Sequence, residues 1–150
     1  MKIKIAFGSD HAGFQVKKEL IKFLAQRGYD VLDLGAHSED SSDYPDYALR
    51  VGKAVTSGRV DRGILACGSG LGMCIAANKV EGIRAVVPWS VPVAKLASEH
   101  NWANVICLPS RFVSISGIKK IVLAWLNTDP SQESRHKRRV KKIRKIESKA

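Results

Sequence analysis

The amino-acid sequence predicts a Rossmann-like α/β fold of the doubly wound type, a three-layer sandwich in which helices cover both faces of a parallel sheet. Two observations predict it. Short runs rich in β-branched residues alternate with amphipathic helical patterns along most of the chain. The length of 150 residues and the balance of 45% hydrophobic and 26% charged residues suit one ordinary soluble domain. We therefore expect a single domain over residues 1–150, with residues 131–150 forming a C-terminal basic helix.

Five runs of the sequence are candidate strands. Each is short, apolar and bounded by glycine, proline or polar residues. The candidates are Ile3–Phe7, Val31–Leu34, Gly63–Cys67, Ala85–Val87 and Val105–Leu108. Because strands that alternate with helices are joined by right-handed crossovers, these five are expected to form one mostly parallel sheet.

The segments between the strands carry helical patterns. In Gly13–Arg27, apolar residues recur at helical spacing among lysines, which predicts an amphipathic crossover helix. Pro45 suits the first turn of a second helix that ends near Ser57, with Asp43 or Tyr44 as its cap. Further helices are expected over Leu71–Asn78, Pro92–His100 and Ser114–Leu126, and in the basic tail around Val140, Ile143 and Ile146.

Positive charge is concentrated at the C-terminus. Of the formal net charge of +11, residues 132–150 contribute +7 through nine Lys or Arg and two Glu, which leaves +4 for the first 131 residues. Such a segment is either a solvated helix face or a binding surface for nucleic acid or an anionic ligand. Both interpretations stay open at this point.

Several classes of protein are disfavoured by the residue pattern. The three cysteines are an odd number without C-x-x-C spacing, so we expect reduced thiols and neither a disulfide framework nor a zinc site. The four histidines lie far apart and form no ligand motif, so no metal is expected. The sequence has neither an apolar run of membrane-spanning length nor a secretory cleavage pattern, which predicts a cytoplasmic protein without a membrane partner.

The loop after the first strand is the first candidate site. Gly8–Gly13 places Asp10 beside His11 at the carboxyl edge of the predicted sheet, where doubly wound folds bind their ligands. A carboxylate next to an imidazole suits proton transfer near neutral pH. In the alternative interpretation, Asp10 only caps the following helix and His11 is merely exposed.

The glycine-rich turn after the third strand is the second candidate site. In Cys67–Gly72, the glycines allow backbone amides to face a phosphate or a developing oxyanion at the start of a helix. A P-loop would continue with Lys-Ser or Lys-Thr, and a dinucleotide fingerprint would occupy the first turn, so an NTPase or a dehydrogenase is disfavoured. The helix field favours the thiolate of Cys67, which would then act as a base; alternatively, Cys67 is a small buried apolar residue, as we expect of Cys74 and Cys107.

Three further places carry candidate side chains. His100 and Asn101 end the fourth predicted helix, where they either serve a site or only terminate the helix. Arg111 follows the fifth strand, and its planar guanidinium suits a phosphate. One stripe of the tail helix is cationic and consists of Arg135, Arg139 and Lys142.

Seven motifs occur together and in order along the chain. They are Gly8-Ser9-Asp10-His11-Ala12-Gly13, Asp43-Tyr44-Pro45-Asp46-Tyr47-Ala48, Cys67-Gly68-Ser69-Gly70-Leu71-Gly72, Ala76-Ala77-Asn78-Lys79, Gly82-Ile83-Arg84-Ala85, His100-Asn101 and Arg135-His136-Lys137-Arg138-Arg139-Val140. This ordered set resembles the B-type ribose-5-phosphate isomerases, a family shared with the galactose-6-phosphate isomerase subunits, over nearly the whole chain. The resemblance implies a homodimer or homotetramer of five-stranded Rossmann-like subunits, with an active site at the subunit interface that needs neither metal nor cofactor.

The resemblance also implies a role for each matching residue. Cys67 would be the base that moves a proton between C2 and C1 of the open-chain sugar. Asp10 and His100 would assist opening of the furanose ring, and Ser69 would help the turn backbone to stabilise the enediolate. The substrate-binding residues would be Gly68, Gly70 and Gly72 in the turn, Tyr44 and Asn101 for the sugar, and His11, Arg111, Arg135 and Arg139 for the phosphate. His100, Asn101 and Arg111 would come from the neighbouring subunit.

The expected reaction is the interconversion of D-ribose 5-phosphate and D-ribulose 5-phosphate through an enediolate, in the pentose phosphate pathway. A six-carbon substrate, allose 6-phosphate or galactose 6-phosphate, is the alternative. A nucleic-acid-binding protein that uses the basic tail is a third interpretation, but the sequence has no RNA-binding signature, so we expect no nucleic-acid partner. Two departures from the family pattern bear on the phosphate site: Pro109 stiffens the loop that carries Arg111, and Glu133 places an acid near Arg135.

Overall fold

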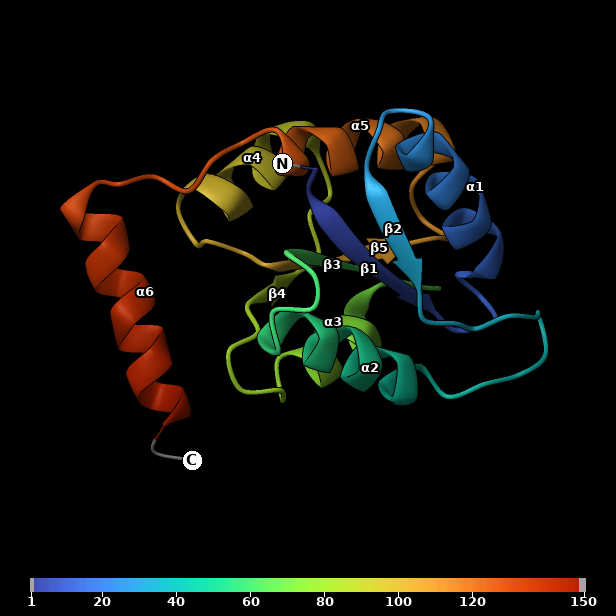
Figure 1. The fold of residues 1–150 in the computed structure, drawn as a ribbon, viewed down its shortest axis with the longest axis horizontal. Coiled ribbons are helices and arrows are strands. Elements are labelled where there is room, and N and C mark those ends of the chain that lie inside the picture. Colours follow the sequence, from blue (N-terminus) through green and yellow to red (C-terminus); the bar gives the residue numbers. More distant parts are fainter. Residues whose placement is uncertain (1, 149–150) are drawn as a thin grey trace.

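The computed structural model describes residues 2–148, which form a five-stranded parallel sheet and six helices (Figure 1). The strands are β1 (Lys4–Ser9), β2 (Asp30–Asp33), β3 (Arg62–Cys67), β4 (Ala85–Val86) and β5 (Val105–Pro109). The helices are α1 (Phe14–Ala25), α2 (Tyr44–Thr56), α3 (Leu71–Ala77), α4 (Val91–Glu99), α5 (Ile115–Leu126) and α6 (Ser134–Glu147). The α/β class and each expected element are confirmed, and the ends of the strands and of the first five helices differ by at most two residues from the prediction. The basic helix expected over residues 131–150 begins three residues later, at Ser134, and residues 149–150 of that prediction lie outside the described residues.

The order of the strands determines where a ligand site forms. The strands lie in the order β2-β1-β3-β5-β4, and every neighbouring pair is parallel. The chain steps from β1 outward to β2 and then returns past β1 to β3, so the winding reverses between β1 and β3. The intervening helices change face at this reversal, as right-handed crossovers require. A reversal of this kind leaves a crevice at the carboxyl ends of β1 and β3.

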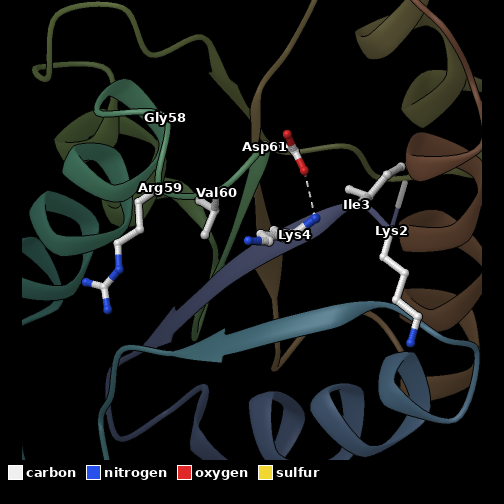
Figure 2. A pocket seen from close by; sticks show the side chains of 7 residues that line it. All are labelled: Lys2, Ile3, Lys4, Gly58, Arg59, Val60 and Asp61. Carbon is white, nitrogen blue, oxygen red and sulfur yellow. Dashed lines mark hydrogen bonds between the residues drawn. The ribbon is translucent and has the colours of Figure 1, made fainter.

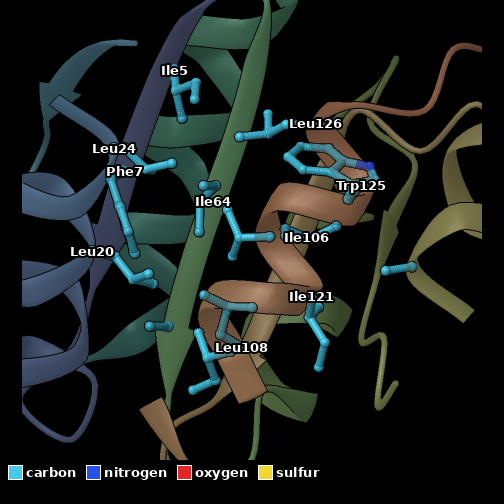
Figure 3. Packing of buried hydrophobic residues seen from close by; sticks show 14 residues of the cluster. Ile5, Phe7, Leu20, Leu24, Ile64, Ile106, Leu108, Ile121, Trp125 and Leu126 are labelled. Carbon is cyan, nitrogen blue, oxygen red and sulfur yellow. The ribbon is translucent and has the colours of Figure 1, made fainter. Parts of the chain in front are cut away.

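Each face of the sheet has its own apolar core. Helices α1, α4 and α5 cover one face, where Phe7, Ile64 and Trp125 are fully buried (Figure 3). Helices α2 and α3 cover the other face, where Leu65 and Met73 are fully buried. Neighbouring residues of β3 point to opposite cores because side chains alternate along a strand. Burying a side chain of this size contributes roughly 1.5–3 kcal/mol, so the two cores hold the strand ends rigidly in place.

Most helix ends agree with their sequence signals. Ser90 and Ser114 are the N-caps of α4 and α5, and each hydroxyl accepts a hydrogen bond from the backbone N–H three residues later. Asp43 occupies the N-cap of α2, as expected, although its carboxylate makes no capping hydrogen bond to the described helix. Pro45 in the first turn of α2 therefore fixes the start of this helix more than the cap does.

Helix α6 lies at one side of the molecule, beyond α4 and β4 and on the opposite side from α1 (Figure 1). It faces the rest of the chain along a narrow stripe in which His136 and Val140 are buried. Near its end, the carboxylate of Glu147 accepts a hydrogen bond from the backbone N–H of Gly82 at 3.0 Å. The predicted tail helix is thus confirmed, and its eight Lys and Arg side chains are exposed.

The helices described here differ from membrane spans in length and composition. None of the helices within residues 2–148 is long and apolar enough to cross a bilayer.

Candidate active site

A hollow of about 350 Å³ opens at the carboxyl ends of β1, β3 and β5, where the topology predicts a ligand site. Its walls come from the three loops that follow these strands and from the start of α2. The lining residues are Asp10, His11, Ala12, Tyr44, Cys67, Gly68, Ser69, Gly72, Arg111 and Phe112. The fold therefore brings together eight of the side chains and glycines that the sequence singles out, from four separate segments.

The loop between β1 and α1 brings a buried carboxylate to the hollow. Asp10 is 6% exposed, and its Oδ1 accepts a hydrogen bond from the backbone N–H of Gly13 at 3.0 Å. A Cβ on Gly13 would lie 2.3 Å from the carbonyl oxygen of Ala66, so only glycine lets this loop pack so closely on β3. Asp10 thus lines the hollow, whereas the N-cap of α1 is Gly13 and no side chain caps this helix, so the interpretation of Asp10 as a helix cap is wrong. Its role in proton transfer stays a prediction.

His11 is oriented by a backbone hydrogen bond. Its Nδ1 accepts a hydrogen bond from the backbone N–H of Ser42 at 3.2 Å. A ring nitrogen that accepts from N–H carries no proton, so the neutral imidazole has its proton on Nε2. Nε2 is therefore a donor, which suits an oxygen of a bound anion. Sequence reasoning missed Ser42, because the segment before α2 has no pattern that places it beside the first loop.

The turn between β3 and α3 surrounds a thiol with backbone donors. Cys67 is 5% exposed, and its Sγ accepts a hydrogen bond from the backbone N–H of Gly70 at 3.1 Å. Gly70 has a φ of +76°, a conformation that glycine adopts without the steric cost of a side chain. The backbone of the turn therefore fixes the sulfur of Cys67 at the end of β3, in the hollow. The hydroxyl of Ser69 accepts from the N–H of Leu71 at 3.2 Å, which fixes its place on the turn.

Tyr44 and Gly72 form one wall of the hollow. Tyr44 begins α2 and is 40% exposed. A Cβ on Gly72 would lie only 2.6 Å from Cζ of the Tyr44 ring. The phenol therefore lies flat against the backbone of α3, and glycine is required at position 72 for this contact.

Arg111 lies over the glycine turn of its own chain. Its backbone N–H donates to the carbonyl oxygen of Gly68 at 3.0 Å, and its Nη1 lies 3.2 Å from the position that a Cβ on Gly68 would take. Pro109 pairs with Cys67 in the sheet, so the stiff loop still delivers the guanidinium to the hollow. This corrects the expectation that a neighbouring subunit supplies Arg111. Phe112, which sequence reasoning missed, lies at the rim beside it and is 77% exposed.

Five expected site residues do not line the hollow. Gly70 belongs to the glycine turn but not to the lining, and the other four are His100 and Asn101 at the end of α4 and Arg135 and Arg139 on α6. The ring of His100 stacks on the ring of His136, with centroids 4.1 Å apart and planes 15° apart. Nε of Arg135 forms an ion pair with the carboxylate of Glu133 at 2.8 Å, so the acid noted in the sequence does engage this arginine. These residues of α4 and α6 form a second group, which we call the α4–α6 junction.

His136 is a member of the junction that sequence reasoning passed over. It is 3% exposed and lies on the same face of α6 as Val140. Its pKa is lowered, first by burial and then by the positive charges of His100, Arg135 and Arg139, against the opposite effect of Glu133. The available signal was its position four residues before Val140, which places an imidazole on the apolar stripe of the helix.

The two other thiols lie behind the hollow, where they were expected as core residues. Cys107 is fully buried, and burial raises its pKa well above the usual thiol value. Cys74 is only half-buried. Hydrogen bonds with the Cys107 thiol and with Asn78 lower the pKa of Cys74 to about 7, against the opposite effect of burial. We therefore expect the thiol of Cys74 to be more reactive than the thiol of a fully buried core residue.

Other parts of the described surface offer less chemistry. A second hollow, of about 380 Å³, lies at the opposite edge of the sheet (Figure 2). Its lining includes Lys2, Lys4, Arg59 and Asp61, and the Asp61 carboxylate accepts a hydrogen bond from the backbone N–H of Lys4 at 2.8 Å. Within residues 2–148, no three His, Cys, Asp or Glu side chains gather as a set of metal ligands. The hollow with Asp10 and Cys67 is thus the stronger candidate for acid–base chemistry.

Fold and hollow together define a Rossmann-like protein in which a carboxylate, a thiol and backbone N–H groups meet at the strand ends where the winding reverses. Comparison with known proteins makes this class more specific. The model of the family described as Ribose/Galactose Isomerase matches residues 5–143. The chain is 48% identical to ribose-5-phosphate isomerase B of Escherichia coli strain K12 over 144 residues, which cover 96% of each chain.

Solved structures agree with this match. Ribose-5-phosphate isomerase B of Clostridium thermocellum superposes with a TM-score of 0.96 and 49% identity, over 98% of this chain and 99% of the other. Ribose-5-phosphate isomerase B of Mycoplasma genitalium, solved with bound ribulose-5-phosphate, superposes with a TM-score of 0.93 and 41% identity. The match covers 100% of this chain and 99% of the other. The chain therefore belongs to the ribose/galactose isomerase family, in its ribose-5-phosphate isomerase B branch.

Proposed function

We propose that this chain interconverts D-ribose 5-phosphate and D-ribulose 5-phosphate through an enediolate. The observation that carries the proposal is the buried Cys67 thiol, which accepts a hydrogen bond from a backbone N–H at the end of β3, in the hollow that Asp10 also lines. The identity of nearly half of the residues to the Escherichia coli isomerase supports the same reaction. So does the ribulose-5-phosphate bound in the Mycoplasma genitalium relative.

The proton transfer follows from the geometry of the turn. The Cys67 thiolate removes the proton from C2 of the open-chain aldose, and the electrons of that C–H bond form the C1–C2 double bond while O1 takes the negative charge. Backbone N–H groups of the turn and the Ser69 hydroxyl donate to this enediolate, which stabilises it more than the neutral sugar. The proton on O2 passes to O1, and the Cys67 thiol returns its proton to C1. The product is the ketose, and Cys67 is again a thiolate.

Ring opening precedes this step when the substrate is the furanose. One oxygen of the Asp10 carboxylate is used by Gly13, which leaves the other to accept a proton from a sugar hydroxyl. His100 would protonate the ring oxygen. Since His100 lies at the α4–α6 junction and does not line the hollow of its own chain, a second chain must bring it there.

We therefore propose that two chains complete each site. One chain supplies the hollow, including Arg111, and the other supplies its junction with His100, Asn101, Arg135 and Arg139. The surface beside the hollow is suited to such contact, because Phe112 of its lining and Leu71 and Ile75 of α3 are large apolar residues that are between 60% and 77% exposed. Residues from a partner would also close the hollow against water.

An assay of ketose formation tests the proposed reaction. Purified protein is incubated with ribose 5-phosphate and a chelator, and ribulose 5-phosphate is measured. We expect turnover that the chelator leaves unchanged. Parallel assays with allose 6-phosphate and galactose 6-phosphate test the sugar size, and a larger kcat/KM for either of them would replace the five-carbon assignment. Absence of turnover on all three sugars would contradict the proposal.

A further inference from the structure

The stack between His100 and His136 is a feature that the proposed chemistry does not yet use. The rings lie 4.1 Å apart and nearly parallel. His136 is buried, and its Nε2 is enclosed without a hydrogen-bond partner among the described residues. A buried ring nitrogen of this kind costs free energy. An apolar ring would pack here at a lower free-energy cost, which points to a use of His136 beyond filling space.

The chain fixes the stack from both sides. The linker before α6 is bonded to the end of α4: the N–H of Ser131 donates to the carbonyl oxygen of Glu99 at 2.9 Å. The indole N–H of Trp102 donates to the carbonyl oxygen of Ser131 at 3.2 Å. These contacts place the first turn of α6 directly against the residue that ends α4. One backbone hydrogen bond and one indole hydrogen bond thus tie the linker before α6 to the end of α4, and they bring His136 against His100.

The charges around the stack favour one protonation pattern. The groups that act on His136 are His100 from α4, Glu133 from the linker, and Arg135 and Arg139 from α6 itself. Three of the four, together with burial, lower the pKa of His136 and so favour its neutral form. A neutral ring stacks on an imidazole without the repulsion that two stacked imidazolium rings would have.

We propose that His136 is a positioning residue for ring opening, whose neutral ring holds the His100 imidazole in the orientation that delivers a proton to the furanose oxygen. Its place between Arg135 and Arg139 also joins the two parts of the junction, since the helix that carries the phosphate arginines carries the ring that orients His100. This inference rests on the proposed function. It assigns to His136 no contact with the substrate.

Three variants separate positioning from general stability. His136→Phe keeps a flat ring and removes the titrating group, and His136→Ala removes the stack. His37→Ala is the matched control, because His37 is an exposed histidine outside both the hollow and the junction. For His136→Ala we expect kcat on ribose 5-phosphate to fall by about 10- to 100-fold with KM nearly unchanged, as for a misplaced catalytic group. His136→Phe should restore most of the kcat, and His37→Ala should match the parent protein.

A second reaction distinguishes ring opening from the later steps. Ribulose 5-phosphate has no furanose form, because its O5 carries the phosphate, so exchange of its C1 proton with D₂O needs Cys67 but no ring opening. We expect His136→Ala to keep this exchange near the parent rate while ribose 5-phosphate turnover falls. The His100 ring protons should move downfield in the NMR spectrum of His136→Ala and stay in place in His136→Phe.

The outcomes are distinct. Equal turnover of His136→Ala and the parent protein would overturn this inference alone, as would an equal loss of turnover and exchange in His136→Ala. A parent protein that catalyses neither reaction would overturn the proposed function, and this inference with it.

Discussion

The hollow and the α4–α6 junction place their side chains by different means. In the hollow, Asp10 and Cys67 are held by backbone N–H groups only three residues away in sequence. In the junction, His100 meets His136 because the linker before α6 is hydrogen-bonded to the end of α4. The difference teaches that the proposed proton-transfer machinery is set by local loop geometry. The groups of the junction that we propose for ring opening and phosphate binding depend on tertiary packing and, in the proposed site, on a second chain.

The largest effect is expected at the centre of the hollow. Cys67→Ala removes the proposed base, so kcat should fall by about 10²- to 10⁴-fold, the range for loss of a general base. The fold should be unchanged, because alanine fills most of the same small buried space. Steady-state kinetics with circular dichroism as a control checks both parts. A variant with parent activity would exclude the thiol mechanism.

A smaller effect is expected in the junction. Arg139→Ala removes a charged donor from the proposed phosphate site, so kcat/KM should fall by about 10- to 100-fold, equivalent to roughly 1.5–3 kcal/mol. Arg138→Ala is the matched control, since Arg138 is an exposed neighbour that points about 100° around the helix. If the two variants lose activity equally, Arg139 has no specific role and only the net charge of α6 matters.

The wall of the hollow offers a test of packing. In Gly72→Ala, the new methyl group would meet the Tyr44 ring at 2.6 Å, and the ring has room to move outward because Tyr44 is 40% exposed. We expect a loss of about 1 kcal/mol in the free energy of unfolding, at the low end for overpacking. KM should rise because Tyr44 no longer lines the hollow as before.

A double-mutant cycle identifies the cause of this loss. If the contact between residues 44 and 72 is responsible, Gly72→Ala costs less free energy of unfolding in a Tyr44→Ala background than in the parent. Equal costs in both backgrounds would place the cause in the backbone of α3.

The smallest expected effect concerns the pH at which Cys74, behind the hollow, becomes reactive. Since hydrogen bonds with Cys107 and Asn78 lower the pKa of Cys74 to about 7, its thiolate should form near pH 7. Alkylation of Cys74 by iodoacetamide, followed by peptide mass spectrometry, should therefore accelerate around pH 7 rather than near the usual thiol value of about 8.5. Cys107→Ala removes one of these hydrogen bonds and should raise the midpoint. An unchanged midpoint in that variant would show that Cys107 does not stabilise the Cys74 thiolate.

The sequence predicted the hollow well because its residues follow strands. Parallel strands end at one edge of a sheet, so loops that begin at Asp10 and Cys67 had to meet once the strand pattern was read correctly. The same argument should have placed Arg111, which follows β5, in the hollow of its own chain; the family resemblance pointed instead to a neighbouring subunit. Local pattern was the better guide at this position.

The junction was less predictable for a physical reason. The tail helix itself follows from its periodicity, but its place depends on hydrogen bonds from Ser131 and Trp102 that join distant segments. The periodicity of apolar residues in the sequence gives no information about such long-range contacts. For the same reason the sequence marked His100 and Arg139 as separate candidates, and the place of His136 on the apolar stripe did not reveal that its ring stacks on His100.

Mixed dimers provide the most direct test of a site built from two chains. Cys67→Ala and His100→Ala are each expected to be nearly inactive alone. When the two are unfolded together and refolded, half of the dimers pair unlike chains, and one of the two sites in each such dimer combines an intact Cys67 with an intact His100. The account predicts recovery of about a quarter of the parent activity, by the equivalence of the sites in a symmetric dimer. If the mixture is no more active than the separate variants, the account is contradicted, because the site would then lie within a single chain.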